Sequence, residues 1–153
     1  MGYRSIIVGT DGSDTAERAV RQAAGLAADE GARLVVVSAY QPSTDRPSGT
    51  ESERVPSELR YTLTDRVQTE ELAERGRAIA KEGGVEKVVV QALEGDPAHV
   101  LLEAAKDFDA DLIVVGSKGL TSHAHFILGS VASSVAHHAP CDVLVAHTTK
   151  VDA

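Results

Sequence analysis

Five short runs of aliphatic, largely β-branched residues constrain the fold of this chain more than any other feature of its sequence. They are SIIVG at 5–9, RLVVVSAY at 33–40, KVVVQAL at 87–93, DLIVVG at 111–116 and DVLVAH at 142–147. Each has the length of a strand and is almost continuously apolar, which is typical of strands buried on both faces of a parallel sheet. Their alternation with helix-like segments predicts an open, five-stranded parallel α/β sheet with helices on both faces.

Capping signals delimit the first two predicted helices. The first begins at Asp14, where Asp14 and Glu17 predict a capping box, and it ends at Gly31. Its alanines recur on one face, as expected of a helix that packs on a sheet. The second helix is predicted to begin near 64–65 and to run to Gly83.

The last two predicted helices have start signals of their own. Asp96 is a favoured cap residue, and Pro97 suits the first helical position that follows it. The final helix is predicted to open at Gly129-Ser130 and to end before Pro140. A helix therefore follows each of the first four strands.

Residues 41–63 depart from this alternation. They hold three prolines among many serine, threonine and charged residues, and so long a connection is unusual in a compact domain. We interpret the segment as a flexible, solvated insertion, with a mobile lid over a neighbouring site as the alternative. No repeat and no second domain are evident, so residues 1–153 are predicted to form a single domain.

Composition narrows the classes of function. The formal net charge is −8, which argues against nucleic-acid binding and against docking on anionic lipid. The apolar runs are far shorter than the roughly 20 residues that a membrane span requires. The single cysteine, Cys141, excludes a disulfide within the chain and suits a reducing compartment. We therefore expect a cytoplasmic protein.

The order of the predicted strands indicates where a ligand would bind. In an open parallel sheet, ligands bind at the carboxyl ends of strands where successive crossovers go to opposite faces. Here that point is expected between the strands 5–9 and 111–116. The loops 10–14 and 117–123 are about a hundred residues apart in the chain, yet both would line one crevice.

The residues of these two loops suit a phosphorylated ligand. Gly116 and Gly119 let the backbone turn sharply and approach a ligand without Cβ interference. The pair 129–130 opens a helix whose free N–H groups suit a phosphate, and the serine adds a hydroxyl. Lys118 adds positive charge, and Asp11 can accept from a ribose hydroxyl. Singly, each could be an ordinary turn, cap or surface residue; their convergence favours a binding site.

The spacing of these glycines resembles a known signature. Residues 116–130 read Gly-x2-Gly-x9-Gly-Ser, which matches G-x2-G-x9-G-(S/T) of the nucleotide-binding subgroup of the universal stress protein (UspA-like) family. The opening IIVGTDGSDTAERAV is similar to that family's first strand and loop, and SAY at 38–40 to the end of its second strand. ILGSVASSVAHHAPCDVLVAH is similar to its last helix and strand.

The resemblance implies a Rossmann-like fold of the adenine nucleotide alpha hydrolase type, with strand order 3-2-1-4-5. It implies a homodimer paired through strand 142–147, and an adenine nucleotide in the crevice, with ATP as the first expectation. Adenine would contact the backbone near 38–39, Asp11 the ribose, and the phosphates the glycine loop and the helix start. The implied contact residues are Gly9, Thr10, Asp11, Ser38, Ala39, Gly116, Ser117, Lys118, Gly119, Gly129, Ser130 and Val131.

Several alternatives stay open at this point. The TDGSD, SAY and LGSV segments also resemble family members that prefer cyclic AMP. A slow ATP hydrolase is another reading, with Mg²⁺ or Mn²⁺ bridging phosphates beside a carboxylate. No general base is evident, so a regulatory binding protein with at most weak ATPase activity is favoured. A dimer that binds no nucleotide is the third reading.

No catalytic residue and no metal site formed by the protein alone are predicted. His123 and His125 make the one close non-adjacent histidine pair, without a cysteine or carboxylate at ligand spacing. Lys118 stands where the family commonly has Arg or His, and Cys141 has no assigned role.

Overall fold

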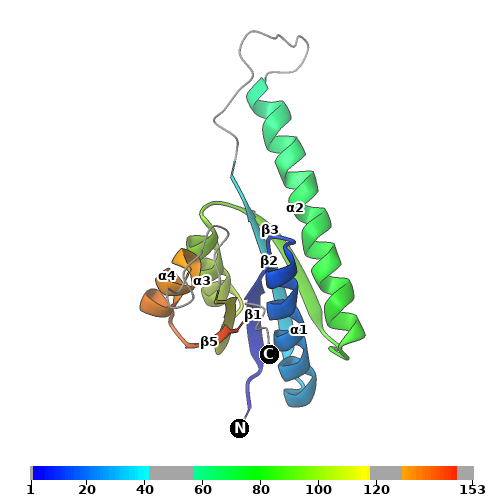
Figure 1. Cartoon of the computed structure of the whole chain (residues 1–153), viewed down its shortest axis with the longest axis vertical. Coiled ribbons are helices and arrows are strands. Elements are labelled where there is room, and N and C mark those ends of the chain that lie inside the picture. The colour runs from blue at the N-terminus through cyan, green and yellow to red at the C-terminus, as the bar shows by residue number, and fades with distance from the viewer. Residues whose placement is uncertain (1, 42–56, 118–128, 148–153) are drawn as a thin grey trace, which may run out of the picture.

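The computed structural model of the chain describes residues 2–41, 57–117 and 129–147, with side chains for all of these except 57–65. Strands and helices alternate along the chain (Figure 1). In order they are β1 (Ser5–Gly9), α1 (Asp14–Glu30), β2 (Arg33–Tyr40), α2 (Ser57–Glu82), β3 (Val88–Glu94), α3 (Pro97–Asp107), β4 (Leu112–Gly116), α4 (Ser130–His138) and β5 (Asp142–Ala146).

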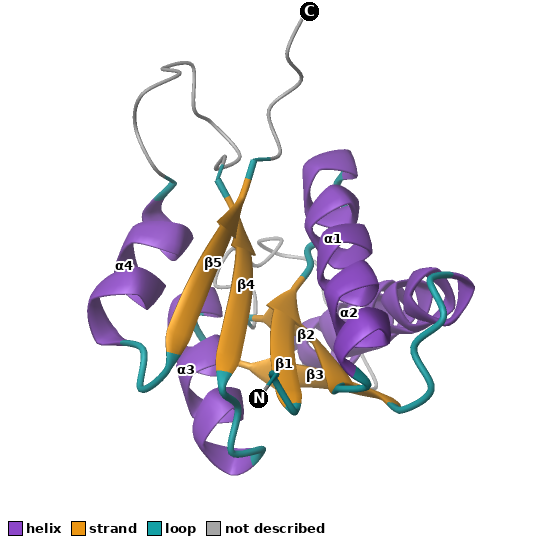
Figure 2. Cartoon of the chain, turned by 90° about the horizontal axis from the view of Figure 1, so that it is seen from below, coloured by secondary structure: helices purple, strands orange, loops and turns teal. Residues whose placement is uncertain are grey.

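The five strands form one parallel sheet in the order β3-β2-β1-β4-β5. This confirms the predicted fold and strand order. β1 lies at the centre, where Val8 is in register with Val36 of β2 on one side and with Val114 of β4 on the other. Figure 2 shows α1 and α2 on one face of the sheet and α3 and α4 on the opposite face.

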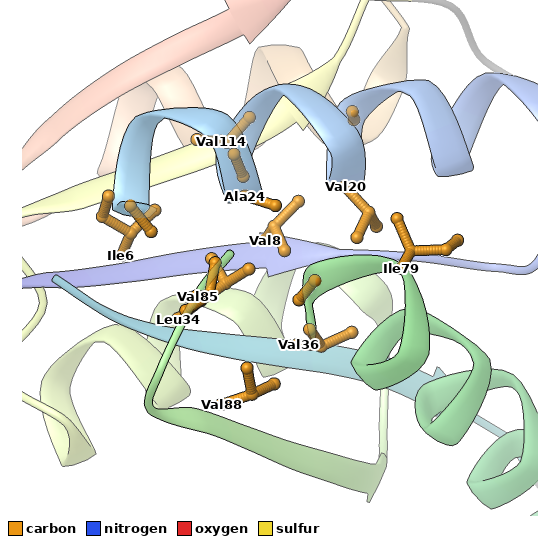
Figure 3. Packing of buried hydrophobic residues seen from close by; sticks show 14 of the residues in the cluster. Ile6, Val8, Val20, Ala24, Leu34, Val36, Ile79, Val85, Val88 and Val114 are labelled. Carbon is orange, nitrogen blue, oxygen red and sulfur yellow. The ribbon is translucent and has the colours of Figure 1, made fainter. Parts of the chain in front are cut away.

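The core has two layers because successive side chains of a strand point to opposite faces. Ile6 and Val8 lie in the layer beneath α1 and α2, whereas Ile7 lies in the layer beneath α3 and α4. All three are fully buried. Figure 3 shows the first layer, in which Val20 of α1 and Ile79 of α2 meet the strand side chains. Burial on both faces is the physical reason for the nearly continuous apolar runs.

The first helix is capped one residue earlier than the sequence predicted. The cap residue of α1 is Ser13, whose hydroxyl accepts from Ala16 N–H at 3.1 Å. Asp14 is already helical, and Glu17 forms an ion pair with another helix instead of closing a capping box. The predicted capping box is therefore wrong. Gly31 ends the helix in the left-handed conformation, with φ of 67°, as predicted.

The second helix is longer than predicted, since it begins at Ser57 and not near 64–65. Within the predicted insertion 41–63, residues 57–63 are helical and residues 42–56 lie outside the described part of the chain. The sequence SELRYTL at 57–63 contains neither proline nor glycine, so nothing in it interrupts a helix. Figure 1 shows the first turns of α2 projecting beyond the sheet.

The starts of α3 and α4 agree with the sequence. Asp96 caps α3 by accepting from His99 N–H at 3.3 Å, and Pro97 follows it. α4 starts at Ser130 after Gly129 and ends before Pro140. Of the helices in the described ranges, none is both long enough and apolar enough to cross a membrane.

Candidate functional site

The carboxyl ends of β1 and β4 lie side by side at the centre of the sheet. Val8 of β1 pairs with Val114 of β4, so the loop that starts at Thr10 emerges next to Gly116. The chain leaves β1 toward α1 on one face and leaves β4 toward α4 on the other (Figure 2). This is the arrangement in which open α/β sheets bind ligands, because the diverging crossovers leave a crevice between them.

Hydrogen bonds to buried groups hold the loop after β1 in one conformation. Thr10 N–H donates to Val37 O at 2.9 Å, and the Ser38 hydroxyl donates to Thr10 O at 2.6 Å. Gly12 N–H donates in turn to the Thr10 hydroxyl at 3.1 Å. Thr10 and Ser38 are 9% and 1% exposed, so water does not compete strongly for these bonds. The loop is therefore tied directly to the end of β2.

Asp11 lies at the exposed surface of this loop. One of its carboxylate oxygens, Oδ1, accepts from Ser13 N–H at 2.9 Å. Such a bond from a side chain to the backbone two residues ahead is typical of an Asx turn. Gly12 between them has φ of +83°, a backbone conformation that favours glycine. The turn thus presents a negatively charged oxygen acceptor at the carboxyl end of β1.

The start of α4 is attached directly to the end of β4. Gly129 N–H donates to Ser117 O at 3.1 Å, and Ser117 N–H donates to Ala146 O of β5 at 2.8 Å. Residues 116–117 and 129–130, twelve residues apart or more, therefore meet at one point. The exposed Ser130 is the first residue of α4, and the half-buried Val131 follows it.

The N-terminus of α4 differs from those of α1 and α3 because its cap residue, Gly129, has no side chain to cap it. Ser13 and Asp96 supply capping oxygens to the other two helices, whereas the cap position of α4 is Gly129, with no side-chain hydrogen bond. The first N–H groups of a helix have no partner within the helix and carry partial positive charge. Among the described residues no side chain caps them, so they suit an anionic ligand.

Comparison with known proteins identifies the family of this chain. The sequence profile of the universal stress protein family matches residues 2–147. The universal stress protein Rv1636 of Mycobacterium tuberculosis is 35% identical over 147 residues, which cover 96% of this chain and 98% of that protein.

The chain belongs to the universal stress protein family.

Solved structures of other universal stress proteins share its fold. A crystal structure of a universal stress protein in complex with cAMP is 32% identical, with a TM-score of 0.74 over 97% of this chain and all of that one. The universal stress protein of Archaeoglobus fulgidus in complex with dAMP is 26% identical, with a TM-score of 0.66 over 95% of this chain and 98% of that one. Both ligands named there are adenine nucleotides with a single phosphate.

In this universal stress protein, most of the predicted site residues lie at the carboxyl ends of β1, β2 and β4. Gly9 ends β1, Thr10 and Asp11 follow it, and Ser38 and Ala39 lie near the end of β2. The remainder of the described set lies at or just after the end of β4, or at or just before the start of α4: Gly116, Ser117, Gly129, Ser130 and Val131. Lys118 and Gly119 lie outside the described residues, as do His123 and His125.

The sequence analysis did not predict the internal hydrogen bonds of two of these residues. Thr10 and Ser38 were expected near the ligand, with adenine on the backbone of 38–39, and the structure adds that their hydroxyls are buried and bonded to the protein. They brace the loop that carries Asp11. A signal was present, because a serine and a threonine directly after buried apolar runs need internal partners. The Thr10 hydroxyl accepts from Gly12 N–H two residues ahead, whereas the Ser38 hydroxyl donates to a carbonyl 28 residues away in the chain, which periodicity does not reveal.

Across 2–41, 57–117 and 129–147, no three histidine, cysteine, aspartate or glutamate side chains cluster as ligands. Cys141 is half-buried near the start of β5. Burial, together with the charges of Asp111 and Asp142, raises the pKa of its thiol, which disfavours the reactive thiolate.

Proposed function

We propose that this universal stress protein binds an adenine nucleotide in the crevice between β1 and β4 and serves as a nucleotide-dependent regulator. The hydrogen bond from Gly129 N–H to Ser117 O carries the proposal. It brings an uncapped helix start next to the end of β4, and β4 is the neighbour of the strand that ends in the Asp11 loop. An uncapped helix start, which suits an anion, and a hydrogen-bond acceptor thereby lie at the carboxyl ends of two neighbouring strands.

In the proposed pose, each part of the nucleotide contacts a different segment at the carboxyl ends of the strands. The phosphate lies against the first N–H groups of α4 and the backbone of 116–117. The ribose hydroxyls donate to Asp11, and the adenine ring lies beside the backbone of 38–39. The complexes of similar universal stress proteins with cAMP and dAMP support an adenine nucleotide as the ligand, since both ligands combine adenine with one phosphate.

We propose ATP as the first ligand and cyclic AMP as the second. The glycine spacing from 116 to 130 supports ATP, through the family subgroup that it resembles. The similarity to a universal stress protein solved with cAMP supports the second. A bound ATP would bring Mg²⁺ or Mn²⁺ with its phosphates. We expect hydrolysis to be slow at most, so that ligand occupancy is the signal.

Direct binding measurements test this proposal. Isothermal titration of the purified protein with ATP, ADP, AMP and cyclic AMP is expected to yield saturable heat with at least one of them. Mass spectrometry of the small molecule that co-purifies with the protein identifies the cellular ligand independently. Absence of binding to all four nucleotides, together with absence of any co-purified nucleotide, would refute the proposal.

Single substitutions in the loop after β1 and at the start of α4 test where the nucleotide binds. Asp11→Ala should weaken binding by about 1–3 kcal/mol if a hydrogen bond to a charged acceptor is lost. Gly129→Val should abolish it, because the branched side chain occupies the space that the phosphate needs. Asp14→Ala, which removes an exposed negative charge three residues after Asp11, is the matched control and should bind normally.

We further propose a homodimer through β5 and a cytoplasmic location. β5 pairs with β4 along one edge, and along its other edge no strand of the described chain pairs with it. Val145 on this strand is 39% exposed, one of the large exposed apolar side chains. A second β5 would complete the hydrogen bonds of this edge and cover the valine. The reducing cytoplasm suits a chain with one free cysteine.

A further inference from the structure

Helix α2 presses directly on the turn that carries Asp11. Leu72 of α2 packs so closely on Gly12 that a Cβ placed there would lie 2.4 Å from Leu72 Cδ2. Gly12 has φ of +83° and sits between Asp11 and Ser13. The side chain of Leu72 therefore closes one side of this turn, at a residue whose conformation determines where the neighbouring carboxylate lies.

One helical turn further along, α2 makes a second attachment to the same region. Arg75 Nε donates to Glu17 Oε2, and Arg75 Nη2 lies 3.4 Å from Glu17 Oε1. The Glu17 side chain is only 8% exposed, whereas that of Arg75 is 65% exposed. Glu17 N–H donates to Ser13 O at 2.9 Å, so the ion pair joins α2 to the residue that caps α1.

Close packing of α2 on the sheet determines how closely Leu72 approaches Gly12. A Cβ on Gly76 of α2 would lie 2.6 Å from Val36 Cγ1 of β2. The absence of a side chain at Gly76 thus lets the helix approach the strand closely. Leu72, Arg75 and Gly76 lie within about one turn of α2. A shift of this turn would therefore change its packing on β2, its contact with Gly12 and its ion pair with Glu17 at the same time.

We propose that Leu72 and Arg75 are positioning residues for the nucleotide site: they fix the 10–13 turn and, through it, the carboxylate of Asp11. This deepens the proposed function and rests on it. Neither residue contacts the ligand in the proposed pose. They act by selecting the turn conformation in which Asp11 meets the ribose, so ligand affinity depends on where α2 lies. Part of the specificity of the site is thereby set by a helix outside the crevice.

The experiment compares four single variants of α2. Leu72→Ala removes the contact with Gly12, and Arg75→Met removes the ion pair while keeping a side chain of similar length. Val67→Ala and Arg66→Met are the controls. Val67 is an exposed aliphatic residue of the same helix, and Arg66 forms an exposed ion pair with Glu70. Neither control residue takes part in the contact with Gly12 or in the ion pair with Glu17.

Two readouts separate positioning from general stability. Amide chemical shifts and hydrogen exchange of Gly12 and Ser13, recorded by NMR in the free protein, report the turn itself. Calorimetric titrations with ATP and with cyclic AMP report affinity, at a temperature where urea unfolding shows every variant to be fully folded. We expect shifted amide signals at the turn in both test variants and affinity reduced by about 2- to 30-fold. The controls should match the wild type.

Arg75→Lys serves as the conservative rescue. Lysine keeps the positive charge beside Glu17 but not the paired donors, so affinity should recover part of what Arg75→Met loses. Unchanged amide signals in both test variants would overturn the inference, as would an equal loss of affinity in the controls. If the wild type binds none of ATP, ADP, AMP and cyclic AMP, and no nucleotide co-purifies with it, the proposed function fails, and the amide signals alone decide whether α2 fixes the turn.

Discussion

At the scale of single residues, one buried hydroxyl, that of Ser38, stabilises the candidate site. Ser38 is 1% exposed and donates to Thr10 O at 2.6 Å, which joins β2 to the loop after β1. Ser38→Ala leaves that buried carbonyl without its donor. We expect this change to lower the free energy of unfolding by about 1–3 kcal/mol. Urea denaturation measures the effect.

The same substitution elsewhere provides the control for Ser38. Ser133→Ala, at a half-buried serine within α4, should change stability by no more than about 0.5 kcal/mol. Nucleotide affinity should also fall in Ser38→Ala, since the loop that carries Asp11 loses an anchor. Equal stability of the two variants would contradict the bracing role of Ser38.

The thiol of Cys141 is predicted to be slow to react. Burial raises its pKa, and the carboxylates of Asp111 and Asp142 add to the effect. The folded protein therefore holds the thiol proton to higher pH than the unfolded chain does. At slightly alkaline pH, iodoacetamide should modify the native protein more slowly than the urea-unfolded protein. Faster modification of the native protein would show that the thiolate is stabilised instead.

The raised pKa of the Cys141 thiol also makes the stability of the protein decrease as the pH becomes alkaline. The contribution of the thiol to stability is fully present below the pKa of the unfolded chain, and it is lost as pH rises through the folded pKa. Replacing Cys141 with serine should therefore reduce the decline of stability toward alkaline pH, which urea titrations at several pH values would measure.

At the scale of helices, two glycines should respond to the same substitution with opposite sign. Gly25 of α1 has no neighbouring atom within 4 Å of a built Cβ, so Gly25→Ala should stabilise by about 0.4–1 kcal/mol. Gly76 of α2 would place its Cβ 2.6 Å from Val36 Cγ1. Overpacking costs about 1–3 kcal/mol and exceeds the helical gain, so Gly76→Ala should destabilise. Thermal unfolding of both variants checks the pair.

The start of α3 depends on one capping carboxylate. Asp96 accepts from His99 N–H, and Asp96→Ala should lower stability by about 0.5–2 kcal/mol. Asp107 lies at the other end of the same helix, where a negative charge meets the negative end of the helix dipole. Asp107→Ala should therefore be neutral or slightly stabilising. If both variants lost stability equally in urea denaturation, the capping assignment would be wrong.

At the scale of the whole molecule, the order β3-β2-β1-β4-β5 leaves β5 at one edge of the sheet. The proposed dimer predicts that Val145→Lys produces a monomer, because a charge would be placed in the strand pairing. Val67→Lys is the matched control, since Val67 is also exposed but lies on α2. Sedimentation velocity distinguishes the two. A monomeric wild type, or a dimer that survives Val145→Lys, would contradict the proposed interface.

The sheet itself could be predicted from the sequence almost to the residue. The predicted runs at 5–9 and 33–40 coincide with β1 and β2, and the other three strands differ by one residue at their ends. The reason is that strands covered on both faces must be apolar throughout, which leaves a local signal. The start of α4 at Ser130 and the caps Gly31 and Asp96 were predicted for the same reason, since capping chemistry is local.

The features that only the tertiary structure decided are contacts between segments distant in the chain. The bond from Ser38 to Thr10, the packing of Leu72 on Gly12 and the pair of Arg75 with Glu17 join residues 28 to 60 positions apart. Glu17 reads locally as part of a capping box, and only the placement of α2 gives it a different partner. The chain thus determines by itself the strands and most helix ends, and it predicts the end of the sheet at which we propose that a ligand binds. The conformation of the loop at that end of the sheet depends on α2, which packs on it. Only the tertiary structure shows this, because packing between distant segments leaves no periodic pattern in the sequence.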